Sequence, residues 1–171
     1  MAYYTASTGT TSYTGTGDAD YFRFNTEFDA QNFDIGTTVD GGSGTDEVIF
    51  SFRSSYATSI TVDLDAGFSV DGVTYVTFSS VENVDLLNTP STQSYTINGT
   101  SSANTLAGDN GNDTINGLGG NDILSGGEGT NVLTHTALLL RAATPWSNVL
   151  TKAPIRWKAV SAIRWGPMSK T

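Results

Sequence analysis

The sequence predicts an all-β fold for residues 1–134, followed by a basic tail of different composition. Three observations lead to this prediction. Gly, Asn and Asp recur at fixed intervals with single aliphatic residues between them, short upstream segments alternate apolar and polar residues, and no long stretch has helical periodicity. These patterns are typical of short strands joined by tight turns.

Residues 99–134 have a period of nine residues, which divides them into four adjacent units: GTSSANTLA, GDNGNDTIN, GLGGNDILS and GGEGTNVLT. Every ninth residue is aliphatic: Leu106, Ile115, Leu124 and Leu133. The residue two positions earlier is always Asn or Asp: Asn104, Asp113, Asp122 and Asn131. A fixed period predicts stacked identical units, here a turn followed by a short strand whose middle side chain points inward.

The same signature occurs upstream without tandem repetition. Residues 41–49 read GGSGTDEVI and residues 15–23 read GTGDADYFR, which puts Asp46 and Asp20 at the corresponding position. For both residues, a calcium ligand and an ordinary turn residue remain open alternatives. We expect a β-rich segment over residues 1–98, with strands at 21–24, 47–52, 60–64, 74–78 and 81–87.

Charge is distributed unevenly along the 171 residues, whose net charge is −9. All 17 acidic residues lie at or before Glu128, whereas six of the eight Lys and Arg residues lie after His135. The acidic part disfavours nucleic acid and anionic membranes as partners and favours cations. Cysteine is absent, so any metal ligands must be oxygens rather than thiolates.

Neither end of the chain carries a familiar targeting signal. Residues 1–30 do not resemble a signal peptide, and no run approaches the ~20 apolar residues of a membrane span. The tail, residues 135–171, is rich in Leu, Ala, Trp, Arg and Lys. Two interpretations of the tail stay open: translation out of frame, or an ordinary basic terminal segment with a short helix over residues 136–143.

The nonapeptides resemble the GGxGxDxUx calcium-binding repeat of RTX proteins, the hemolysin type, in which U is a large aliphatic residue. Residues 41–49 fit all five defined positions, and the last three units of the array fit four each. The resemblance implies a parallel β-roll or β-solenoid over residues 99–134. It also implies that two nonapeptides complete one coil, so that units 18 residues apart stack and share an ion.

The family's ligand pattern carries over to two expected calcium sites. The first uses the Asp113 and Asn131 side chains with backbone carbonyls of Asp109, Gly111, Gly126 and Glu128. The second uses the Asn104 and Asp122 side chains with backbone carbonyls of Thr100, Ser102, Gly117 and Gly119. Each site has one carboxylate and one amide where the family pattern has two carboxylates, which lowers the expected affinity.

Oxygen-rich turns of this kind suit calcium, a hard ion that takes six to eight oxygen ligands. Each nonapeptide buries one aliphatic side chain, worth ~1.5 to 3 kcal/mol. Ordering nine residues costs ~1 to 2 kcal/mol each, so we expect residues 1–134 to gain β structure when calcium binds. The alternative is a metal-free solenoid in which stacked Asn side chains bond to the backbone.

No HExxH, GxSxG, Walker A or dinucleotide-binding motif occurs, and His135 is the only histidine. We therefore expect a non-enzymatic structural or adhesion module that binds calcium and an unidentified cell-surface or extracellular ligand. The order ITVDLDAG, VENVDLL and nonapeptides resembles that of large secreted RTX and adhesin-like bacterial proteins, which implies an extracellular location and type I secretion. The basic tail does not resemble the acidic or apolar signal of that route. The alternative is the repeat portion of a secreted RTX hydrolase, a protease or lipase.

Overall fold

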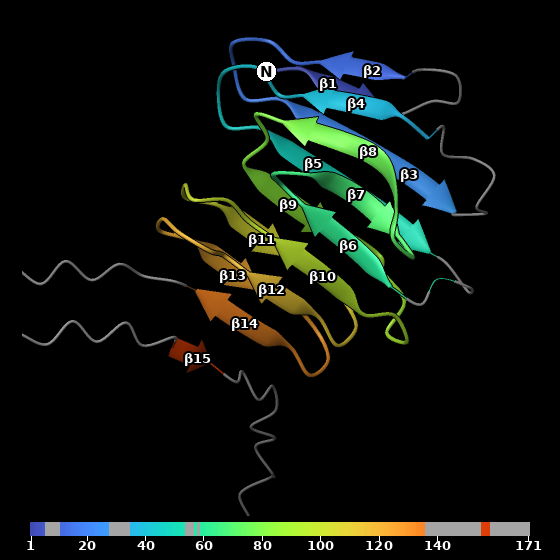
Figure 1. Ribbon diagram of the computed structural model, residues 1–171, viewed down its shortest axis with the longest axis vertical. Helices are drawn as coiled ribbons and strands as arrows, with labels where there is room; N and C mark the ends of the chain where they lie inside the picture. Colours follow the sequence, from blue (N-terminus) through green and yellow to red (C-terminus); the bar gives the residue numbers. More distant parts are fainter. Residues whose placement is uncertain (6–10, 28–34, 54–56, 58, 136–154, 158–171) are drawn as a thin grey trace, which may run out of the picture.

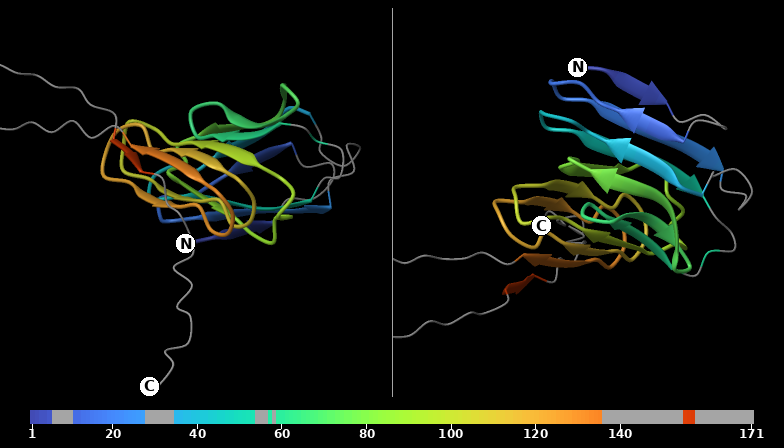
Figure 2. Two further views of the ribbon diagram at one scale, coloured as in Figure 1. Left: turned by 90° about the horizontal axis from the view of Figure 1, so that it is seen from below. Right: turned by 45° about the horizontal axis from the view of Figure 1, so that its top comes forward.

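The computed structural model describes residues 1–5, 11–27, 35–53, 57, 59–135 and 155–157. These residues form strands and turns without any helix, which confirms the all-β prediction. The strands belong to two sheets that lie face to face (Figure 1). Figure 2 shows the same arrangement from below, where the chain passes around a flattened interior between the sheets.

The first sheet contains six strands, all paired in parallel. In spatial order they are β1 (Tyr3–Thr5), β3 (Tyr21–Glu27), β5 (Glu47–Arg53), β9 (Asn83–Leu86), β11 (Thr105–Ala107) and β13 (Ile123–Ser125). The second sheet contains nine strands. In spatial order they are β15 (Ile155–Trp157), β14 (Val132–His135), β12 (Thr114–Asn116), β10 (Tyr95–Asn98), β6 (Ile60–Asp63), β7 (Gly67–Val70), β8 (Val73–Ser79), β4 (Thr37–Asp40) and β2 (Ser12–Thr14).

Consecutive nonapeptides lie in opposite sheets, so each strand of the array pairs with the strand two units later. β11 pairs with β13 and β12 pairs with β14, with Leu106 opposite Leu124 and Ile115 opposite Leu133. The partners are 18 residues apart, the step expected from the period. Because a strand alternates its side chains, this register points all four aliphatic side chains between the sheets.

The core between the sheets is thick in the N-terminal part and thin in the array. Phe24, Phe50 and Phe68 stack in sequence, with ring centroids 4.9 Å and 4.7 Å apart. In the array each strand contributes a single aliphatic side chain to this core. Leu106 and Ile115 are fully buried, whereas Leu124 and Leu133 are only partly buried. Apolar packing therefore supports residues 1–98 better than it supports the last units of the array.

The expected strands of residues 1–98 appear as β3, β5, β6, β8 and β9, whereas β1, β2, β4, β7 and β10 were not among the predicted strands. β7 runs antiparallel to β6 and β8, so the second sheet is not parallel throughout. Asp71 and Gly72 join β7 to β8 with φ angles of 48° and 82°. Asp-Gly between alternating apolar residues favours a two-residue hairpin, so this signal was present in the sequence.

Three tail residues, Ile155–Trp157, pair antiparallel with β14. The helix expected over residues 136–143 lies outside the described residues. In the part of the chain that the structure describes, no helix is long and apolar enough to cross a membrane.

Candidate calcium-binding turns

The Asp or Asn of each repeat lies just before its strand and points inward. Three of these four residues are at least 96 % buried: Asn104, Asp113 and Asn131. The backbone N–H of Asp113 donates to Oδ1 of Asn131 over 2.7 Å. Likewise, the N–H of Asn104 donates to Oδ1 of Asp122 over 2.9 Å. The first two units are thus each joined to the unit 18 residues later by a bond that we call a rung.

The rungs form two rows, one beside each sheet. Asp113 and Asn131 precede strands of the nine-stranded sheet, whereas Asn104 and Asp122 precede strands of the six-stranded sheet. The structure therefore brings each expected pair together, Asp113 with Asn131 and Asn104 with Asp122.

Glycine is required in these turns because the backbone of one turn approaches the next. A Cβ on Gly127 would collide with the carbonyl oxygen of Asp109, and φ at Gly127 is 68°. A Cβ on Gly108 would lie 2.6 Å from Oδ2 of Asp113. The carboxylate of Asp113 therefore sits in a cradle that any larger residue at position 108 would fill.

One side-chain oxygen of Asp113 lacks a hydrogen-bond partner among the described residues. Its Oδ1 accepts the N–H of Tyr95 over 2.9 Å, but its Oδ2 is buried and has no hydrogen-bond partner within the described chain. Burial, reinforced by the nearby charge of Asp109, raises the pKa of the Asp113 carboxyl to about 6. An ionised carboxylate in this position lacks compensation, which a bound cation would provide.

Two of the backbone carbonyls expected at this site already link the turns. The carbonyl of Asp109 accepts the N–H of Glu128 over 2.8 Å, and the carbonyl of Glu128 accepts the N–H of Gly111 over 3.0 Å. Each carbonyl oxygen retains a second lone pair, so these bonds do not prevent it from acting as a ligand.

The residues around Asp113 fit a calcium ion by donor type. Across the described residues, no three His, Cys, Asp or Glu side chains gather into a metal-binding group. A cation at Asp113 would therefore depend on carbonyl and amide oxygens for most of its shell, and calcium accepts such a shell. When bound, calcium would supply positive charge beside the Asp113 carboxylate.

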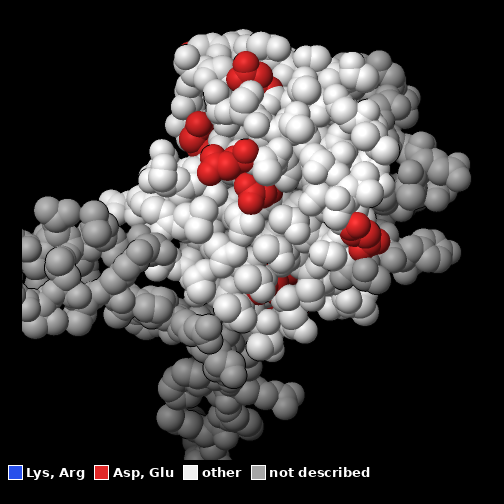
Figure 3. All heavy atoms as spheres, in the orientation of Figure 1, with Lys and Arg blue, Asp and Glu red and all other residues white. Residues whose placement is uncertain are grey.

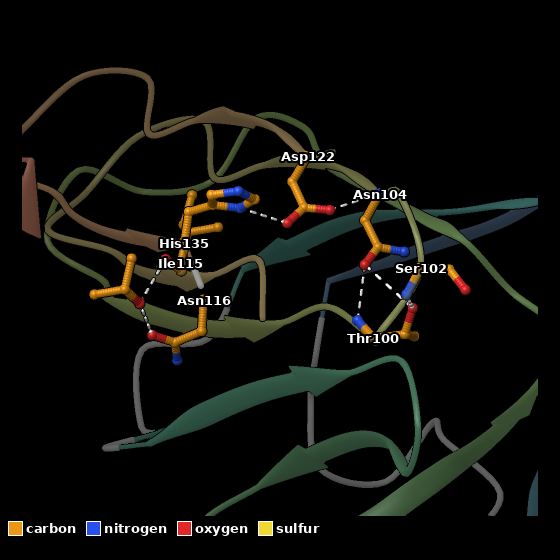
Figure 4. Close-up of polar contacts among 8 residues, drawn as sticks. Thr100, Ser102, Asn104, Ile115, Asn116, Asp122 and His135 are labelled. Carbon is orange, nitrogen blue, oxygen red and sulfur yellow. Dashed lines mark hydrogen bonds and ion pairs between the residues drawn. The ribbon is translucent and has the colours of Figure 1, made fainter. Parts of the chain in front are cut away.

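The second expected site differs, because protein groups already satisfy its side chains (Figure 4). Oδ1 of Asn104 accepts the N–H of Thr100 over 2.7 Å, and Nδ2 donates to the carbonyl of Glu82 over 2.7 Å. Oδ2 of Asp122 lies 2.8 Å from Nδ1 of His135. This arrangement corresponds to the metal-free alternative, in which stacked side chains bond to the backbone.

Sequence reasoning missed both His135 and Glu82 as members of this row. Oε2 of Glu82 accepts the N–H of Asp46 over 2.8 Å, and the backbone carbonyl of Glu82 accepts a hydrogen bond from Nδ2 of Asn104. The signal was its place directly before β9, at the position that Asp or Asn takes in the repeats. Asp20 and Asp46 lie in the same row, joined by a rung of 2.7 Å from the Asp20 N–H to Oδ1 of Asp46.

Stacked Gly-rich turns with buried Asp and Asn side chains define this part of the chain as a repeat with oxygen ligands. Residues 98–133 match the family of the RTX calcium-binding nonapeptide repeat in four copies, which confirms the predicted repeat. Repeats of this family bind Ca²⁺. No curated protein and no solved structure matches the chain.

Proposed function

We propose that this chain is the calcium-binding repeat module of a secreted bacterial protein, with a non-catalytic structural or adhesion role. Its repeats wind as a β-roll in which calcium holds adjacent coils together. The observation that carries the proposal is the rung between Asp113 and Asn131, where a buried carboxylate oxygen has no partner in the described chain.

The thin core of the array supports a folding role for the ion. Leu124 and Leu133 are only partly buried, and Ile123 and Val132 are 67 % and 48 % exposed. These last strands therefore gain little from apolar burial. A cation that binds only the folded turns stabilises them by mass action, by about 2.7 kcal/mol at a hundredfold excess over Kd.

The surface also suits a cation-binding protein. Acidic side chains are scattered over the face shown in Figure 3, where no Lys or Arg of the described residues is visible. Repeats that bind calcium through mixed carboxylate and amide sites need a calcium-rich medium, which favours an extracellular location. We place the module there, in contact with an unidentified cell-surface or extracellular ligand.

The second candidate is the repeat portion of a secreted hydrolase, a protease or lipase, whose catalytic groups would lie outside the residues that the structure describes. His135 is the only histidine of the chain, and its Nδ1 contacts Asp122 within the row of rungs. We therefore assign His135 a structural role at this contact.

Circular dichroism and chemical denaturation of the full chain test the proposal. Calcium should increase the β signal of calcium-free protein and raise the free energy of unfolding, and magnesium should do neither at equal concentration. Asp113→Asn should reduce the calcium effect, whereas Asp65→Asn, a change of equal charge in an exposed turn, should preserve it. Identical spectra and identical stability with and without calcium would contradict calcium-coupled folding.

A further inference from the structure

A pair of turns outside the matched repeats reproduces the geometry of the array. Residues 15–20 and 41–46 are 26 residues apart, yet Tyr21 pairs with Glu47 in parallel strands. The N–H of Asp20 donates to Oδ1 of Asp46 over 2.7 Å, and the N–H of Glu47 donates to the carbonyl of Asp20 over 2.9 Å. The corresponding bonds around Asp113 and Asn131 measure 2.7 Å and 2.8 Å.

The likeness extends through the turns themselves. The N–H of Ser43 donates to the carbonyl of Thr16 over 3.2 Å, just as Glu128 donates to Asp109 over 2.8 Å. Gly42 and Gly44 have φ angles of 88° and 136°, and the equivalent Gly127 and Gly129 have 68° and 111°. The two upstream turns therefore stack as the tandem turns do, although 26 residues rather than 18 separate their rung residues.

The upstream pair differs from the array in charge. Both of its rung residues are carboxylates, Asp20 at 1 % exposure and Asp46 at 0 %. Oδ2 of Asp46 is buried without a hydrogen-bond partner in the described chain, and a Cβ on Gly41 would lie 2.6 Å from it. Asp46 therefore occupies the same kind of cradle as Asp113.

The surroundings of Asp46 favour a cation. Burial raises the pKa of the Asp46 carboxyl, and the charges of Glu82, Asp20 and Asp40 add to this effect. Asp20 differs, because its two oxygens accept the N–H groups of Ala2 and Thr16, and the backbone hydrogen bond from Thr16 lowers its pKa. A role for Asp20 as a ligand would use the remaining lone pairs of these oxygens. Several negative charges thus lie near one buried oxygen, which accepts no hydrogen bond from the part of the chain that the structure describes.

We propose that Asp20 and Asp46 form a calcium centre outside the tandem repeats, and that it binds calcium more tightly than the centre between Asp113 and Asn131. This inference extends the proposed function, on which it rests. Carbonyls of Thr16, Asp18, Gly41 and Ser43 would complete the shell, as the equivalent carbonyls would in the array. The ranking follows from ligand charge, because the number of carboxylates is one of the quantities that set calcium affinity.

Isothermal titration calorimetry of the full chain with calcium chloride tests the proposal. The wild-type chain should show one tight class of sites and at least one weaker class. Asp46→Asn should weaken the tight class by about tenfold or more and leave the weaker class in place. Asp113→Asn should affect only the weaker class.

The substitutions are chosen to preserve the fold. An Asn at position 46 retains an oxygen that accepts the N–H of Asp20, and the circular dichroism spectrum of this variant checks that its fold is kept. Asp20 is left unchanged, because both of its oxygens accept backbone N–H groups, from Ala2 and from Thr16. Asp65→Asn is the matched control, because it makes the same change of charge at an exposed residue that belongs to neither proposed centre. This control should leave the tight class within about twofold.

The outcomes separate this inference from the proposed function. A single weak class that Asp113→Asn removes and Asp46→Asn leaves unchanged would overturn the upstream centre and leave the array function standing. A tight class that Asp46→Asn removes, without any class sensitive to Asp113→Asn, would support the upstream centre and count against the array.

Discussion

The backbone N–H of Asp113 donates to Oδ1 of Asn131 over 2.7 Å, although the two residues are 18 positions apart. This rung uses only one atom of the Asn131 side chain, whose Nδ2 donates to the carbonyl of Gly127 over 3.3 Å. The second oxygen of Asp113 remains buried without a partner in the described chain. The rungs therefore align adjacent coils. The second polar atom of Asn131 bonds within its own turn, whereas the second oxygen of Asp113 has no such bond in the described chain and marks the place where a cation is needed.

Close approach of adjacent turns predicts a strong effect of Gly127→Ala. The new Cβ would collide with the backbone of Asp109 at a positive φ, so the free energy of unfolding should fall by more than about 1 kcal/mol. Calcium affinity should fall as well, because the Asp109 carbonyl would be displaced. Gly17→Ala is the control, because a Cβ there meets nothing within 4 Å. Urea denaturation measures the free energy of unfolding of both variants. Equal losses of this free energy would show that the turns are not tightly stacked.

The raised pKa of Asp113 predicts how pH affects the calcium-free protein. This pKa rises from 3.8 to about 6 on folding, so protonated Asp113 is favoured in the folded state. Its stabilising contribution is complete below 3.8 and is lost as pH increases through about 6. The free energy of unfolding in calcium-free buffer should show this decrease, and Asp113→Asn should reduce it. A pH dependence identical in the variant would assign the decrease to other groups.

The same pKa predicts competition between protons and calcium. Calcium needs the ionised carboxylate, so the apparent affinity of the Asp113 centre should weaken as pH falls below about 6. Calorimetric titrations at several pH values measure this dependence. An affinity that stays constant between about pH 7 and about pH 5 would remove Asp113 from the ligand set.

The contact between His135 and Asp122 predicts a structural role for the last residue of β14. His135→Ala would leave Oδ2 of Asp122, whose side chain is fully buried, without its 2.8 Å partner. Loss of this partner should lower the free energy of unfolding by about 1 to 3 kcal/mol. His135→Gln, which retains an N–H donor, should recover part of the loss. Thermal unfolding of the wild type and both variants measures these differences in stability. Equal stability of all three proteins would contradict a structural role for His135.

The sequence predicted the array well because period, turn chemistry and strand alternation all agree there. The 18-residue spacing between Leu106 and Leu124 places them at the same point of successive coils, which keeps both side chains inside. The pairing of Asp20 with Asp46 did not follow from the period, because 26 residues separate them. Only the three-dimensional register revealed that the two isolated turns are neighbours.

Side-chain bonding within the rows was beyond sequence reasoning. Asn104 and Asn131 occupy the same repeat position, yet Nδ2 of Asn104 donates to Glu82 and Nδ2 of Asn131 donates to Gly127. The difference arises from the neighbouring coil, which is not a nonapeptide on the Glu82 side. Such contacts depend on which turn lies next to a residue. Sequence spacing alone does not determine which turn that is.

Asn131→Asp tests whether Asp113 and Asn131 share one ion. The substitution keeps the oxygen that accepts the N–H of Asp113 but replaces Nδ2 with an oxygen that faces the Gly127 carbonyl. Without calcium these oxygens repel, so the free energy of unfolding should fall. With calcium they become ligands, so affinity should increase by about tenfold.

The decisive measurement is the calorimetric Kd of Asn131→Asp in the wild-type and Asp113→Ala backgrounds. The shared ion predicts a clear gain in affinity in the wild-type background and little gain once Asp113 is removed. An unchanged Kd, or a gain that persists fully without Asp113, would contradict the shared calcium centre.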